Sequence, residues 1–174
     1  MTYRGAAAAC LVAFAVALLG PSAEAAPHAT VYRVDRVTDG DTIVLRNDQR
    51  VRLVQIDSPE KFFGLECYAR ESSDAAERLL PEGTRVRLLV VPVGDRVDDF
   101  GPLLRYVVRL DGVNVNLRLV ALGAAAPWFY DGERGMYANR LEALAKRARA
   151  KRLGLWGACP STRYDPYSGI ETRR

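Results

Sequence analysis

The chain has 174 residues, a formal net charge of +4 and a hydrophobic fraction of 49%. This length suits one domain with one core, and the absence of internal repeats in the sequence excludes a repeat array. The positive charge is compatible with nucleic acid, anionic lipid or another acidic polymer as a partner, and it does not choose among them.

The first 26 residues have the features of a secretory signal peptide. Arg4 precedes an apolar run over residues 6–19, and an A-x-A cleavage site follows at residues 23–25. We therefore predict that residues 1–26 are cleaved and that the protein is secreted or periplasmic, with no stable membrane association afterwards. The apolar run is short for a bilayer span, and an uncleaved anchor is the alternative.

Cleavage would leave two of the three cysteines, Cys67 and Cys159. An even pair in an exported chain predicts a disulfide. The loop that it closes is long, so the chain-entropy model gives a stabilisation of about 4 to 5 kcal/mol. Two free buried thiols or a metal pair are the alternatives, although two cysteines with no nearby histidine make a poor zinc site.

Hydrophobic patterning predicts mostly strands between residues 31 and 110. The expected strands are residues 31–37, 42–45, 51–56, 84–91 and 103–110. A polar turn at residues 47–49 joins the second strand to the third, and Asp111 and Gly112 form a second hairpin turn. We expect helices at residues 67–80, 116–122 and 136–152, and a flexible tail from residue 160 to residue 174. About five strands with an interposed helix suit a small Greek-key barrel of the OB type.

The hairpin that joins the second and third strands carries carboxylates at its open end. If its strands pair about Asp48, Asp41 lies opposite Ile56 and therefore beside Asp57. Like charges opposite each other destabilise a ladder, so we expect a cation between them. Carboxylate oxygens suit calcium or magnesium. The alternative is a pair of turn carboxylates that cap backbone N–H groups.

Four segments resemble the staphylococcal nuclease (thermonuclease) family. They are DGDT at residues 39–42, VRLVQIDSPE at 51–60, YVVRLDGVNVNLRLVALG at 106–123 and LGLWG at 153–157. The resemblance covers about residues 29–159. It implies an α+β fold with a small OB-type five-stranded Greek-key β-barrel and about three packed helices, in a domain that extends from residue 27 to residue 159.

The resemblance also implies roles for matching residues. One calcium ion would be held by Asp41, Asp57 and the backbone carbonyl of Ser58. Arg52 would grip the phosphate, and Glu60 would act as general base or orient the attacking water. The alternatives are a structural ion pair for Arg52 and an exposed loop position for Glu60.

The chain departs from the family at the second catalytic arginine, which Pro102 replaces. Loss of one preorganised donor costs about 10² to 10³ in rate, so a slow nuclease is expected. Arg96 or Arg105 could substitute, although strand alternation directs Arg105 away from the Pro102 face. Phe100 stands at a substrate-contacting tyrosine position.

Aromatic and basic residues supply candidate substrate contacts. Counted without gaps, Phe129 falls at the position of a nucleotide-stacking tyrosine, and Tyr130 is its neighbour. Together with Trp128 and the basic face of the helix at residues 136–152, these rings could track a strand of nucleic acid. Core aromatics and a solvated helix face are the alternative.

The sequence therefore predicts a monomeric, exported, calcium-dependent endonuclease that hydrolyses DNA, RNA or both. A non-catalytic OB-fold module that binds nucleic acid or another polymer is the alternative. A disulfide-braced envelope protein with an ancestral site is a third hypothesis.

Overall fold

The computed structural model describes residues 30–62, 64–91, 97 and 101–172. The predicted leader, Phe100 and Arg96 lie outside these residues.

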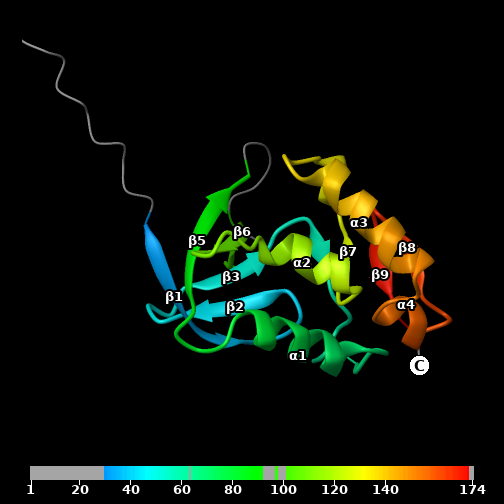
Figure 1. The fold of residues 1–174 in the computed structure, drawn as a ribbon, viewed down its shortest axis with the longest axis horizontal. Coiled ribbons are helices and arrows are strands. Elements are labelled where there is room, and N and C mark those ends of the chain that lie inside the picture. Colours follow the sequence, from blue (N-terminus) through cyan, green and yellow to red (C-terminus); the bar gives the residue numbers. More distant parts are fainter. Residues whose placement is uncertain (1–29, 63, 92–96, 98–100, 173–174) are drawn as a thin grey trace, which may run out of the picture.

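Five strands close into a barrel in the order β1-β2-β3-β6-β5 (Figure 1). They are β1 (Val31–Val37), β2 (Thr42–Leu45), β3 (Arg50–Leu53), β5 (Arg85–Val90) and β6 (Leu103–Arg109). All neighbours are antiparallel except β3 and β6, which are parallel. A closed, mixed, five-stranded sheet with packed helices confirms the predicted α+β fold of the OB type.

In the described part of the chain, three helices pack around the barrel, as predicted, and a fourth is a single turn. They are α1 (Ala69–Leu79), α2 (Val115–Leu122), α3 (Ala138–Ala150) and α4 (Leu155–Ala158); a short 3-10 turn, η1, covers Tyr130–Gly132. Gly123 ends α2 in the left-handed region with a φ of 69°. A Cβ on Gly154 would lie 2.2 Å from the Gly123 oxygen, so α4 can approach α2 only because position 154 is glycine.

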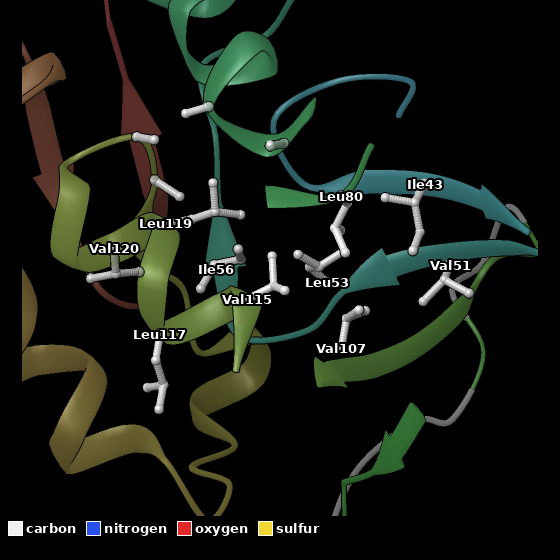
Figure 2. Close-up of a cluster of buried hydrophobic side chains, with 14 of the residues drawn as sticks. Ile43, Val51, Leu53, Ile56, Leu80, Val107, Val115, Leu117, Leu119 and Val120 are labelled. Carbon is white, nitrogen blue, oxygen red and sulfur yellow. The ribbon is translucent and has the colours of Figure 1, made fainter. Parts of the chain in front are cut away.

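The main core lies between the barrel and the helices. Figure 2 shows Val51 and Leu53 of β3 and Val107 of β6 facing Leu80 and Val115. Strand alternation sends the residues of β3 and β6 inward, and the short apolar helix α2 fills the space beside them. A second, smaller apolar cluster includes two residues of α4 and consists of Ala126, Ala148, Leu155, Trp156 and Cys159.

The strand predicted at residues 51–56 is divided in two. β3 ends at Leu53, and Ile56–Asp57 forms β4, which pairs with β7 (Ala126–Pro127). Between them Gln55 adopts a left-handed φ of 62°. The Gln55 side chain holds this turn, because its Nε2 donates to the Glu133 carbonyl at 2.9 Å and its Oε1 accepts from the Tyr106 hydroxyl.

The hairpin register also differs from the prediction. Thr42 pairs with Arg52, and the amide of Leu53 donates to the Asp41 carbonyl at 2.7 Å. Asp41 therefore lies opposite Leu53 and not opposite Ile56. Asp57 still reaches Asp41, because the turn at Gln55 redirects the chain after β3.

The predicted disulfide joins Cys67 to Cys159, with an S–S distance of 2.00 Å. Where the sequence predicted a flexible tail, the structure has a hairpin of β8 (Arg163–Asp165) and β9 (Gly169–Glu171). Asp165 closes its turn, since its Oδ1 accepts from the amides of Tyr167 and Ser168.

The hairpin packs onto the second cluster through Tyr164 and Ile170.

None of the helices in the described part of the chain has the length and apolar composition needed to cross a membrane.

Candidate active site

Arg52 lies between two aspartates at the end of the β2–β3 hairpin. Its Nη1 is 3.0 Å from Oδ1 of Asp41, and its Nη2 is 3.4 Å from Oδ1 of Asp57. The structural ion pair that was the alternative role for Arg52 is therefore present. The two distances also show that one positively charged group can lie close to the carboxylates of Asp41 and Asp57 at the same time.

Asp41 is buried, and hydrogen bonds hold its carboxylate from several sides. Its Oδ2 accepts from the Ser58 amide at 2.9 Å, and its Oδ1 accepts from the Thr42 hydroxyl at 3.2 Å. A Cβ on Gly40 would lie 2.1 Å from Oγ of Ser72 and 2.7 Å from Cβ of Ser58. Glycine at position 40 therefore lets the acidic turn pack directly against the segment that carries Ser58.

Asp57 is held by a part of the chain that sequence reasoning left out of the site. Its Oδ2 accepts from the amide of Ile170, on β9, at 2.9 Å. The expected tail is thus in contact with a predicted metal ligand. No local pattern in the sequence signals this contact, because 113 residues separate the two partners.

Two acidic side chains at this site, Asp57 and Asp39, have raised pKa values. Burial, and then the charge of Asp41, raise the pKa of Asp57 to about 7. The same two causes, in the same order, raise the pKa of Asp39 to about 6. Arg52 opposes both shifts without cancelling them, and a cation bound beside these carboxyl groups would favour their charged forms further.

Glu60 lies three residues beyond Asp57, at the protein surface. Its amide donates to Oε2 of Glu66 at 3.0 Å, and its carbonyl accepts from the Glu66 amide at 2.9 Å. Desolvation, and then the negative charge of Asp41, raise the pKa of the Glu60 carboxyl. Both of these hydrogen bonds are made by the backbone of Glu60 and do not involve its own carboxylate.

The donor set fits a hard divalent cation such as calcium. Asp41 and Asp57 offer carboxylate oxygens within reach of one guanidinium, and Ser58 is bonded to one of them through its amide. Among the described residues, no group of three or more His, Cys, Asp or Glu side chains forms a metal-binding cluster. A cation here would therefore need backbone carbonyl or water oxygens as further ligands, which calcium accepts readily.

The predicted stacking residues have different environments. Phe129 is fully buried in the main core, so its ring cannot stack on a base, and that prediction is corrected. Tyr130 is 56% exposed. Trp128, the third aromatic of the predicted stacking run, packs over Arg52 with the guanidinium carbon 5.4 Å from the ring centroid, and it meets Tyr130 edge to face at 5.6 Å. The contact with Arg52 places this ring, and not that of Phe129, beside the aspartates.

Pro102 is buried just before β6, whose first residue, Leu103, pairs with Val51 of the strand that carries Arg52. Arg105 lies further along β6, and its Nη1 donates to the Leu104 carbonyl at 2.7 Å. The other proposed substitute, Arg96, and the substrate candidate Phe100 lie outside the described residues.

Comparison with known proteins gives a family for this fold and site. Residues 50–158 match the family described as "Staphylococcal nuclease homologue". A protein named "Uncharacterized endonuclease" from Escherichia coli is 39% identical over 127 residues, which cover 71% of this chain and 75% of the relative. The thermonuclease of Staphylococcus intermedius is 31% identical over 131 residues, with 72% and 75% covered.

A third relative, endonuclease YhcR of Bacillus subtilis, is 31% identical over 139 residues, which cover 71% of this chain and 11% of that protein. The barrel, the aspartate–arginine site and these matches agree. The chain belongs to the staphylococcal nuclease family.

Proposed function

We propose that this protein is an exported, calcium-dependent endonuclease that hydrolyses phosphodiester bonds of DNA, RNA or both. The observation that carries the proposal is Arg52 placed between Asp41 and Asp57, in a member of a nuclease family. Phosphodiester hydrolysis needs charge stabilisation, a positioned water and a nearby base, and these residues supply matching groups.

Asp41, Asp57 and the carbonyl of Ser58 are the proposed ligands of one calcium ion. When bound, the ion would supply positive charge for the phosphate oxygens in the transition state. The guanidinium of Arg52 carries five N–H donors in a fork that matches two phosphate oxygens. Glu60 takes the proton of the attacking water or orients that water.

The substrate is a nucleic-acid strand that lies across the opening of the site. Trp128 and Tyr130 offer ring faces for bases beside Arg52. Exposed basic residues of α3, such as Lys146 and Arg147, add attraction for the phosphates. Phe100 remains a proposed contact outside the described residues.

Export to the periplasm or the cell exterior is part of the proposal. The Cys67–Cys159 disulfide supports it, because such bonds persist in oxidising compartments. We propose that the mature chain acts as a monomer without stable membrane association.

Cleavage of single-stranded and duplex DNA and of RNA, with calcium and with a chelator, tests the function. Asp41→Ala and Glu60→Gln should each lower kcat by about 10² or more, because each removes a group that acts on the transition state. Asp74→Ala and Glu77→Gln remove exposed carboxylates of α1 and should leave kcat unchanged. Unchanged cleavage by Asp41→Ala would overturn the proposal.

A non-catalytic nucleic-acid-binding module is the second candidate, favoured by Pro102 in place of the second arginine. It predicts no cleavage by the wild-type protein and salt-dependent binding of single strands that survives Glu60→Gln. The same assays, with a binding measurement added, separate the two functions.

A further inference from the structure

The C-terminal hairpin lies against the candidate site and is tied there from several directions. Ile170 donates its amide to Oδ2 of Asp57 at 2.9 Å. A Cβ on Gly169 would lie 2.6 Å from the same carboxylate oxygen and 3.8 Å from Cδ1 of Trp128. The Phe129 amide donates to the Pro166 carbonyl at 2.6 Å. The hairpin thus contacts the metal-ligand side of the site closely.

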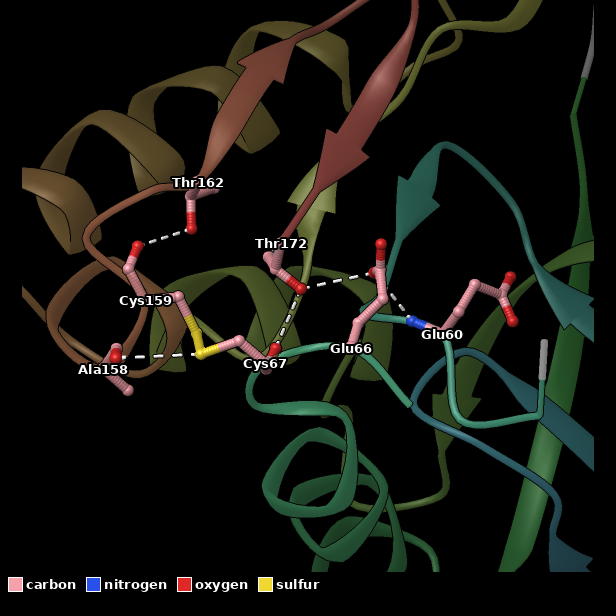
Figure 3. The surroundings of a disulfide bond; sticks show 7 residues. All are labelled: Glu60, Glu66, Cys67, Ala158, Cys159, Thr162 and Thr172. Atoms are coloured by element: carbon pink, nitrogen blue, oxygen red, sulfur yellow. Dashed lines mark hydrogen bonds between the residues drawn. A yellow bond between two sulfur atoms is a disulfide. The ribbon is translucent and has the colours of Figure 1, made fainter. Parts of the chain in front are cut away.

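Beyond β9 the chain reaches the loop that carries Glu60. The Cys67 amide donates to the Thr172 carbonyl at 3.2 Å, and the Thr172 hydroxyl donates to the Cys67 carbonyl at 2.9 Å. The same hydroxyl lies 3.3 Å from Oε2 of Glu66. Figure 3 shows Thr172, Glu66 and Glu60 in this order beside the disulfide.

Glu66 links the contacts made by Thr172 and Cys67 to Glu60. One residue satisfies both the N–H and the carbonyl of Glu60, through its side chain and its own amide. Two hydrogen bonds in opposite directions fix the peptide planes on both sides of the Glu60 Cα. They thereby fix the direction of the Cα–Cβ bond, from which the Glu60 side chain starts.

The segment of Glu66 and Cys67 is itself held in place by covalent and apolar contacts. Cys67, which follows Glu66, is bonded to Cys159. Cys159 belongs to the second apolar cluster, against which Tyr164 of β8 and Ile170 of β9 pack. The disulfide and the hairpin therefore fix the same short segment from two sides.

We propose that Glu66 is a positioning residue that orients Glu60, and that the C-terminal hairpin holds both Glu66 and Asp57 in their working places. This inference rests on the proposed nuclease function. It adds a part of the site, residues 163–172, that lies beyond the family match at residues 50–158. Small changes in the hairpin should therefore affect catalysis and calcium binding more than they affect the structure of the barrel.

Glu66→Ala tests the link to Glu60. A misplacement of about 1 Å can cost about 10² in rate, so we expect kcat to fall by 10- to 100-fold while KM and the calcium Kd stay unchanged. Glu66→Gln should restore most of kcat, because the amide oxygen accepts the same hydrogen bond. Glu77→Ala on the exposed face of α1 is the matched control and should behave as wild type.

A second readout does not depend on cleavage. Amide hydrogen exchange at Glu60, measured without calcium, should be at least 10-fold faster in Glu66→Ala and near the wild-type rate in Glu66→Gln. Unchanged exchange, or a kcat equal to wild type, would overturn the positioning role. A wild-type protein that does not cleave would overturn the proposed function instead, and the exchange result would still decide whether Glu66 holds Glu60.

Gly169→Ala tests the hairpin, and Gly112→Ala is its matched control. The φ angles are similar, +84° and +87°, but a Cβ at position 169 meets Asp57 whereas one at position 112 meets nothing within 4 Å. Both variants share the backbone strain. Only Gly169→Ala should weaken calcium binding, by about 10-fold in calorimetry, because it displaces the hairpin from Asp57. Equal calcium Kd values in the two variants would contradict the proposal.

Discussion

At the residue scale, the site depends on how Arg52 is shared. Its guanidinium contacts both Asp41 and Asp57, and Trp128 covers it from another side. Buried carboxylates beside each other repel, and a partly buried arginine stabilises them when no other cation is present. The same arginine is the proposed phosphate ligand. The guanidinium N–H groups that pair with Asp41 and Asp57 are therefore the same groups that would bind the phosphate.

Pro102 stands where the family resemblance predicts the second catalytic arginine, and this position allows a gain-of-function prediction. Pro102→Arg should raise kcat for DNA cleavage by about 10² if it supplies a missing donor to the transition state. Pro102→Gln controls for loss of the proline ring, because it adds no charge, and should show little gain. Steady-state cleavage with calcium measures both.

If Pro102→Arg gives no gain over an efficient wild-type enzyme, another cation already fills that role. Arg105, on the strand that Pro102 precedes, is then the first candidate among the described residues.

At the scale of elements, one buried side chain connects the barrel to the turn that aims Asp57. Asn116 of α2 accepts from the Val107 amide at 3.0 Å and donates to the Val54 carbonyl at 2.9 Å. Val54 adjoins Gln55, whose left-handed φ redirects the chain into β4. The helix therefore helps to set the direction of the segment that carries Asp57 and Ser58.

Asn116→Ala should lower the free energy of unfolding by about 2 to 4 kcal/mol, because it leaves two buried backbone groups without partners. Asn114 offers a matched comparison, since its Oδ1 only caps α2 by accepting from the Leu117 amide. Asn114→Ala should cost about 1 kcal/mol. Urea denaturation of the two variants measures the difference, and equal costs would contradict the bridging role of Asn116.

At the scale of the whole molecule, the disulfide joins segments 92 residues apart. The Cys67→Ser, Cys159→Ser double variant should lose about 4 to 5 kcal/mol of unfolding free energy by the chain-entropy account. Denaturation of the wild-type protein with a reducing agent should give the same loss. The reducing agent should leave the double variant unaffected, and a loss there would point to a different cause.

Much of the fold followed from the sequence because local pattern decides which residues become buried. The hydrophobic pattern of residues 31–37 and the Val, Ile and Leu of residues 42–45 predicted β1 and β2 with the bounds that the structure has. The motif spacing placed Asp41 and Asp57 together, although the register behind that prediction was off by three residues on one strand. The paired cysteines predicted the disulfide by count alone.

Tertiary structure decided what local pattern does not encode. A glutamine at a positive φ divides β3 from β4, and its partners, Tyr106 and Glu133, come from distant segments. Phe129 is buried in the main core, where Arg134 lies over its ring and Tyr167 lies 6.3 Å away, and its neighbours in sequence do not reveal this. Contacts across such separations depend on how complete elements pack against one another. For the same reason the amide of Ile170 reaches Asp57 only after the chain has closed the barrel and returned.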